Sequence, residues 1–186
     1  MADHSPDQFE VFIDAYLPNW MAEELEKTIE NSDTFWDEVK KEYEKVWKEW
    51  WVHDIAYHLD DELKVLYETL AYNDLHLSDS CRVKRLKAYE ELLNGFKDAI
   101  RRALKDGRPL TELELRDWYK KMGEAVYGYK NNDYEKEVTY YLNYYDMLDY
   151  DEKLEILNAL LNDYIDSDLH YIKEKLSELG ALTNRS

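Results

Sequence analysis

The chain has 186 residues, with 42 Asp and Glu against 24 Lys and Arg, and its net charge is -18. Its hydrophobic fraction of 45% is enough for a folded core, so the acidity does not indicate disorder. A field of this sign repels nucleic acid and membrane phosphates and attracts basic proteins. The composition therefore argues against direct binding to nucleic acid or to a membrane, and it favours a basic protein as the partner.

Other features of the composition indicate where such a protein works. The single Cys81 cannot form an intramolecular disulfide, which fits a reducing compartment. The first residues lack the pattern of a signal peptide, and no apolar run approaches the ~20 residues of a membrane span. We therefore expect a soluble cytoplasmic protein, in the cytoplasm of the host cell if the chain is viral. No cofactor is expected.

The N-terminal part of the chain predicts four helices, because its apolar residues recur at three- and four-residue steps. Ser5-Pro6 opens the first helix, which Pro18 ends. A second helix runs from Asn19 to about Glu30. The third begins at residues 31–33 and carries a tryptophan stripe, which we interpret as core with one ring at its rim. A fourth restarts at Asp60 or Asp61 and ends near Asn73.

The C-terminal part predicts further helices. Ser78 or Ser80 caps a basic helix, and the turn at residues 106–109 separates it from a helix opened by Thr111. A Tyr-rich helix starts at Asp133, followed by helices near residues 151–165 and 167–179, the last with Gly180 as its C-cap. We expect an all-α fold of about eight helices, a single domain over residues 1–186 with possible sub-lobes 1–106 and 107–186 that meet near residues 106–110.

The charge is distributed unevenly along these elements. Residues 1–80 carry 21 acids and 6 bases (-15), and residues 109–186 carry 17 acids and 9 bases (-8). Residues 82–108 reverse the sign, with 9 bases and 4 acids (+5). We expect the basic helix, residues 82–105, to pair with its own acidic neighbours, and contact with a ligand is the alternative.

The most unusual segment lies between Asn131 and Tyr171, with 8 Tyr and 11 acids against Lys136 and Lys153. Its tyrosines surround the helix, so they cannot all be buried, and some face solvent or a partner. Tyr anchors among carboxylates are typical of a binding face. The residues expected to bind the partner are Tyr141, Tyr145, Asp146, Asp149, Asp151, Glu152, Glu155, Asp163, Asp166 and Asp168.

A rival acidic face lies near the start of the tryptophan-bearing helix. Acids four residues apart on a helix are separated by one turn of about 5.4 Å. That spacing is of the same order as the distance between neighbouring phosphates on a nucleic-acid strand. The residues of this rival partner-binding face are Asp33, Asp37, Glu38 and Glu42.

Known catalytic and metal-binding patterns are largely missing. The sequence contains neither Glu-x-x-His nor His-Glu-x-x-His, and no Asp-rich loop has the glycine of an EF-hand, so no metal site is expected. His53-Asp54 resembles HD-type phosphohydrolases in this dipeptide, and His58 follows about one turn on. A helical metal-dependent phosphohydrolase built around His53, Asp54 and His58 is therefore an alternative, although we expect no enzyme.

The leading hypothesis is an acidic helical inhibitor that binds a basic, nucleic-acid-binding protein and blocks it stoichiometrically. In composition the chain resembles the DNA-mimicking viral and mobile-element proteins that block restriction or CRISPR nucleases, and it matches no family motif. An immunity or antitoxin protein that caps a basic toxin is a second possibility, and a helical adaptor is a third. The chain can also form a homodimer.

Overall fold

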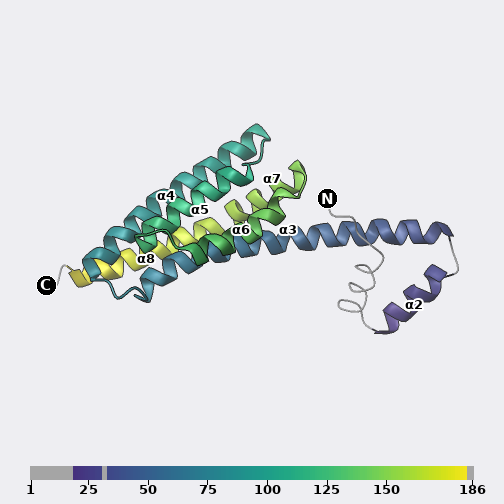
Figure 1. The fold of residues 1–186 in the computed structure, drawn as a ribbon, viewed down its shortest axis with the longest axis horizontal. Coiled ribbons are helices and arrows are strands. Elements are labelled where there is room, and N and C mark those ends of the chain that lie inside the picture. The colour runs from purple at the N-terminus through teal and green to yellow at the C-terminus, as the bar shows by residue number, and fades with distance from the viewer. Residues whose placement is uncertain (1–18, 31–32, 184–186) are drawn as a thin grey trace. The chain divides into compact units, whose positions relative to one another are not determined.

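The computed structural model describes residues 19–30 and 33–183 (Figure 1). Every regular element in these ranges is a helix, and none is a strand. The helices are α2 (Asn19–Glu30), α3 (Asp33–Ala71), α4 (Asp79–Asp106), α5 (Glu112–Tyr127), α6 (Asn132–Asp146), α7 (Tyr150–Ala159), the π-helix η1 (Leu160–Ile165) and α8 (Asp166–Thr183). The all-α prediction is confirmed.

The number of helices is lower than the predicted eight, because the described ranges form six uninterrupted helical runs. Residues 33–71 are one helix with no restart at Asp60, and α7, η1 and α8 continue into one another. The last run passes through Gly180, so Gly180 is not the predicted C-cap. The helix predicted at Ser5 lies outside the described residues.

The chain divides into two compact units, residues 1–51 and residues 52–186. In the first unit, the rings of Trp47 and Trp51 stack with centroids 5.5 Å apart, and Tyr43 is buried. Trp50 is 44% exposed, and Trp47 and Trp51 are only half-buried, so the interpretation of the tryptophan stripe as core is wrong for these three rings. The turn at residues 106–110, considered as a sub-lobe boundary, lies inside the second unit.

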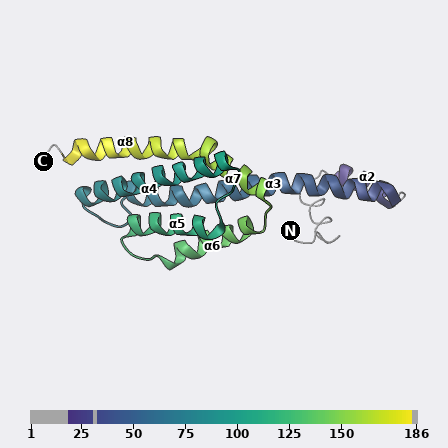
Figure 2. The same cartoon turned by 90° about the horizontal axis from the view of Figure 1, so that it is seen from above.

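The second unit is a helical bundle in which α3 contributes residues 52–71. In Figure 2, α8 lies on one side, α3 and α4 lie in the middle, and α5 and α6 lie on the other side. Because α3 lies in the middle, its leucines are buried against helices on both sides. The largest fully buried side chains of the unit are Ile55, Leu59, Leu63, Leu66, Leu70, Leu86, Tyr89, Leu93, Phe96, Tyr119 and Tyr145.

Buried tyrosines connect the helices of this core through their hydroxyl groups. Tyr89 of α4 donates to the carbonyl oxygen of Leu63 at 2.8 Å, and Tyr119 of α5 donates to that of Leu59 at 2.7 Å. Each hydroxyl thus finds the partner that a buried polar group needs. Burial raises the pKa of both phenols well above 10.0, so both stay neutral and remain donors.

The helix ends follow capping rules that are visible in the sequence. Ser78 and Thr111 accept hydrogen bonds from the backbone N–H groups of Cys81 and Glu114. Gly107, with φ of 65°, adopts the left-handed conformation after α4 that favours glycine. These caps confirm the predicted starts of α4 and α5 and the turn between them.

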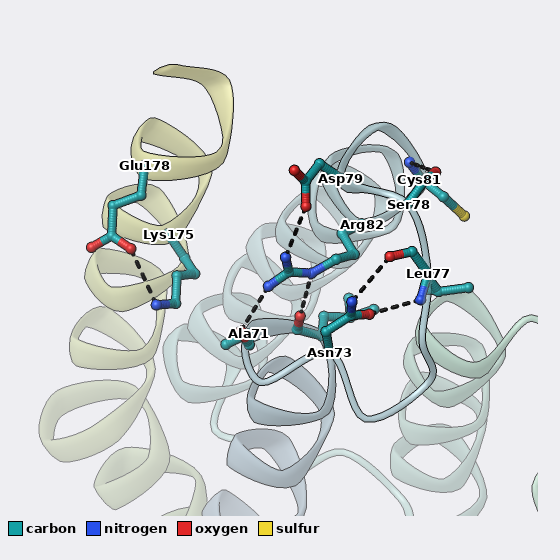
Figure 3. Close-up of polar contacts among 10 residues, drawn as sticks. Ala71, Asn73, Leu77, Ser78, Asp79, Cys81, Arg82, Lys175 and Glu178 are labelled. Carbon is teal, nitrogen blue, oxygen red and sulfur yellow. Dashed lines mark hydrogen bonds and ion pairs between the residues drawn. The ribbon is translucent and has the colours of Figure 1, made fainter. Parts of the chain in front are cut away.

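Arginines of the basic helix α4 complete the ends of two other helices. Arg82 donates from Nε to the carbonyl of Leu70 at 2.9 Å and from Nη2 to that of Ala71 at 2.7 Å, at the end of α3 (Figure 3). Arg85 donates to the carbonyl of Val126 at 2.9 Å, near the end of α5. The last carbonyls of a helix lack intrahelical donors, and a cation there also interacts favourably with the helix dipole.

Ion pairing of the predicted kind is found further along α4, where Lys97 pairs with Asp166 of α8. Arg82 also pairs with Asp79, and Arg101 lies 3.8 Å from Asp98, both on α4 itself. The basic helix therefore uses its charge on the backbone carbonyls of two helices, on a carboxylate of α8 and on acids of its own.

Candidate functional site

A row of aromatic rings crosses from α3 to α6 on the second unit. The ring of Tyr57 meets that of His58 edge-on at 5.4 Å, and His58 stacks on Tyr141 with centroids 4.4 Å apart and planes 9° apart. Tyr140 contacts both Tyr141 and Tyr144 at 5.2 Å. We call these five residues, Tyr57, His58, Tyr141, Tyr140 and Tyr144, the aromatic ladder.

Helix geometry explains why the ladder forms. Tyr140 and Tyr144 are four residues apart on α6, so their side chains lie on the same face, and their hydroxyls are 3.4 Å apart. Tyr57 and Tyr140 are 51% and 55% exposed, whereas His58, Tyr141 and Tyr144 are half-buried. The ladder therefore offers ring faces and edges to solvent while its middle is held in place by packing.

Carboxylates surround the ladder. Asp54 Oδ1 lies 3.4 Å from His58 Nε2, and Asp61 and Glu137 are exposed on α3 and α6. Burial and then the charge of Glu137 raise the pKa of Tyr141 above 10.0, and the same two causes raise the pKa of the buried Glu62 to about 8. The negative charge around the ladder therefore opposes the loss of a proton from Tyr141 and from Glu62.

A second acidic group lies inside the bundle, between α3 and α8. Asp60 is fully buried and Asp168 is 1% exposed, and the Tyr67 hydroxyl donates to Asp168 Oδ1 at 2.9 Å. Lys64 Nζ is 3.3 Å from Asp60. Burial first, then Asp60, raises the pKa of Asp168 to about 9. At neutral pH, Asp168 therefore holds a proton that it can donate to Asp60.

The structure distributes the residues of the predicted partner-binding face between surface and interior. Asp146, Asp149, Asp151, Glu155, Asp163 and Asp166 are exposed, with Asp146 3.9 Å from Lys153 and Asp166 paired with Lys97. Tyr141 is half-buried in the ladder.

Three residues of that prediction require correction, because they are buried. The Tyr145 hydroxyl donates to the carbonyl of Leu110 at 2.6 Å inside the core. Glu152 closes a capping box with Asp149 at the start of α7. Asp168 belongs to the interior pair with Asp60. Their side chains hold the bundle together and are not part of its surface.

The rival acidic face lies on the part of α3 that belongs to the first unit. Asp37, Glu38 and Glu42 are exposed there. The side chain of Asp33 lies outside the described residues. The exposed acids are of the type predicted, and the same unit also carries the ring cluster of Trp47, Trp50 and Trp51, in which the Trp50 and Trp51 centroids are 5.7 Å apart.

The residues considered as a phosphohydrolase centre are placed as follows. His53 is exposed, whereas His58 belongs to the ladder, with its Nε2 3.4 Å from Asp54 Oδ1. In residues 19–30 and 33–183 no group of three or more His, Cys, Asp or Glu side chains is arranged to hold a metal ion.

Two further findings bear on function. No helix in the described ranges is long and apolar enough to span a bilayer. Comparison with protein-family models, with curated proteins and with solved structures gave no match for the chain. Any functional argument therefore depends on the chemistry of this surface.

Sequence reasoning missed half of the ladder. It selected Tyr141 from the Tyr-rich helix but treated His58 as a possible metal ligand and gave Tyr57 no role. A signal in the sequence could have found both residues of α3. His58 lies four residues after Asp54, and Tyr57 lies four residues before Asp61, so each ring has an acid one turn away.

Proposed function

We propose that this chain is an acidic inhibitor protein that binds a basic, nucleic-acid-binding protein and blocks its nucleic-acid site. The observation that supports this function best is the aromatic ladder with Asp54, Asp61 and Glu137 around it. Tyrosine is enriched at the centres of protein interfaces, where it supplies a large rigid contact with a polar tip.

The chemistry of the ladder favours arginine over lysine in the partner. A guanidinium group stacks on an aromatic ring and at the same time donates in a fork to a carboxylate. The exposed Tyr57 and Tyr140 supply such rings, and Asp61 and Glu137 supply carboxylates on the same two helices. Arginine is also the side chain with which many proteins contact phosphates.

The exposed acids of α7 and of the following turns extend this surface. Asp151 and Glu155 are both exposed and lie four residues apart, about one 5.4 Å turn. Asp163 adds an exposed carboxylate further along the same helical run. A row of this spacing presents charge to a partner in place of the phosphates of a strand.

The first experiment measures binding of two fluorescent peptides of equal length and charge, one rich in arginine and one rich in lysine, by anisotropy at low and physiological salt. We expect the arginine peptide to bind more tightly, and both to weaken as salt rises, since exposed charges are screened beyond about 8 Å at 0.15 M. Replacing Tyr140 and Tyr144 together by Ser should remove most of the preference for arginine.

The matched control is Tyr72→Ser, because Tyr72 is 69% exposed, directly follows the end of α3 and belongs neither to the ladder nor to the acids of α7. If this change weakens arginine binding as much as the ladder change does, the ladder is not the binding surface. Equal binding of the two peptides at every salt concentration would contradict the proposed chemistry.

The second experiment tests inhibition and tells the two acidic faces apart. A basic DNA-binding protein bound to labelled duplex is titrated with the chain, and release of the duplex is followed. Two sets of acids are each changed to Lys together. The C-terminal set is Asp146, Asp149, Asp151 and Glu155, and the N-terminal set is Asp33, Asp37, Glu38 and Glu42. We expect reversal of the C-terminal set to suppress release of the duplex and reversal of the N-terminal set to leave it unchanged; the opposite result would place the binding face on the first unit.

A further inference from the structure

A cavity of about 270 Å³ lies between α5 and α6, on a part of the bundle that the proposed function does not use. Three basic residues line it: Arg116 and Lys120 of α5, and Lys130 of the loop between the two helices. Glu135 is the acidic residue of its wall. In a chain with a net charge of -18, a cavity with this excess of cations stands apart from its surroundings.

The guanidinium of Arg116 has hydrogen-bonding capacity left over. Its Nη2 group pairs with Glu112, one turn earlier on α5, and this pair orients the side chain. Its Nε is enclosed and has no hydrogen-bond acceptor in the described part of the chain, whereas the side chain as a whole is 42% exposed. An anion in the cavity therefore meets the accessible part of the guanidinium, which the ion pair with Glu112 leaves only partly engaged.

The two lysines add charge that is only partly compensated. Lys130 Nζ lies 3.8 Å from Glu135, at the outer limit of an ion pair. No carboxylate lies within ion-pair distance of Lys120 in the ranges that the structure describes. With Glu112 and Glu135 both counted against the three bases, the cavity keeps one positive charge.

The apolar residues of the lining are almost closed to solvent. Tyr119 is 0%, Val138 2% and Tyr134 5% exposed, and the Tyr134 hydroxyl donates to the carbonyl of Tyr119 at 3.0 Å. Thr139 adds a hydroxyl to the wall. The volume falls just below the range of about 300–1,000 Å³ typical of sites for drug-sized molecules.

We propose that this cavity binds a small oxyanion, a phosphate or carboxylate group. Arg116 and Lys120 contact the oxyanion, because a guanidinium and an ammonium are the groups that proteins use for phosphate and carboxylate. A nucleic-acid strand does not fit, because its further phosphates would meet the acidic surface around the cavity.

The test uses three probes, phenyl phosphate, benzoate and inorganic phosphate, with the Val138 methyl signals in an NMR titration as the readout. We expect saturable shifts of these methyls with the anion that binds, and binding of phenyl phosphate and inorganic phosphate within about threefold of each other, because the apolar residues of the lining are almost closed to solvent and add little contact area. A preference for phenyl phosphate over benzoate identifies phosphate as the anion, and the reverse identifies carboxylate. The absence of a saturable Val138 shift with every probe overturns the proposal.

Variants separate a built site from general attraction by charge. Arg116→Gln and Lys120→Gln should each weaken the tightest probe about tenfold, and Arg116→Lys should recover less than half of that loss in free energy, because lysine lacks the planar fork of donors. The control is Lys121→Gln, since Lys121 follows directly on α5, pairs with Asp117 at 2.9 Å and does not line the cavity. Equal losses in Lys120→Gln and Lys121→Gln, with far-UV circular dichroism unchanged in both, also overturn the proposal.

Discussion

Replacing Asp168 by Asn is expected to stabilise the protein, and to do so more strongly as pH rises. The Asp168 side chain is 1% exposed, and its pKa is raised to about 9 from an ordinary 3.8. Below pH 3.8 the group is protonated in both the folded and the unfolded chain, so it has no effect. Between pH 3.8 and 9 the unfolded chain releases the proton while the folded chain keeps it, and the free energy of unfolding falls with rising pH.

The size of the effect follows from this difference. Each pH unit between the two pKa values corresponds to about 1.4 kcal/mol, so the full effect at pH 7 would be on the order of 4 kcal/mol. Asn keeps the oxygen that accepts from Tyr67, and its amide can donate to Asp60, but Asp60 stays buried, with Lys64 Nζ 3.3 Å away. We therefore expect a gain of about 2 kcal/mol at pH 7.5 and less than about 1 kcal/mol at pH 5.

The measurement is urea unfolding at pH 5, 6.5 and 8, followed by far-UV circular dichroism. Self-repulsion of a chain of net charge -18 also weakens as pH falls, so a control is needed that alters the charge alone. Asp163→Asn serves, because Asp163 is exposed on η1 in the same helical run. If the stability curves of Asp168→Asn and Asp163→Asn run parallel between pH 5 and 8, the reasoning about the buried pair is refuted.

Two further changes test the packing of the bundle. Gly123→Ala should destabilise the bundle by about 1–2 kcal/mol in thermal or urea unfolding, because the added Cβ would lie 2.5 Å from Tyr134 Cε1. The control is Gly180→Ala, whose added Cβ would meet no atom within 4 Å, so this change should be neutral or stabilising. Arg82→Ala should lower the free energy of unfolding by about 2–3 kcal/mol, since it removes two charged hydrogen bonds to the carbonyls at the end of α3, whereas the exposed Arg101→Ala should change it by less than about 0.5 kcal/mol. Equal effects in either pair would contradict the packing described here.

Local chemistry made part of the fold predictable. Ser78 and Thr111 cap their helices as their spacing predicts, and Gly107 ends α4, because capping depends on neighbours within four residues. The restart predicted at Asp60 was wrong for a tertiary reason. In the sequence, Asp60 resembles the N-cap of a new helix. Its partner in the structure, Asp168, lies about a hundred residues further along the chain, where local patterns do not reveal it.

The candidate site was predictable only in outline for a related reason. The excess of Tyr and acids in residues 131–171 predicts a surface of this composition, but it does not say which side chains are buried. Tyr140 and Tyr145 are both plausible anchors in the sequence, and the approach of Leu110 to Tyr145 decides that the second is core. The partners on α3, Tyr57 and His58, lie too far along the chain to be linked to α6 by periodicity.

The same interior contacts explain how the chain keeps a strongly negative surface despite a basic helix. Arg82 donates to two backbone carbonyls and pairs with Asp79 at 3.1 Å, and Arg85 donates to the carbonyl of Val126. Lys97 pairs with Asp166. These cations of α4 are therefore engaged elsewhere than at Asp61 and Glu137, the carboxylates near the ladder, whose field a basic partner meets during approach. Charge of this kind acts mainly on the rate of association and the contacts of the rings on the rate of dissociation, so salt should change the first and the Tyr140 and Tyr144 substitutions the second.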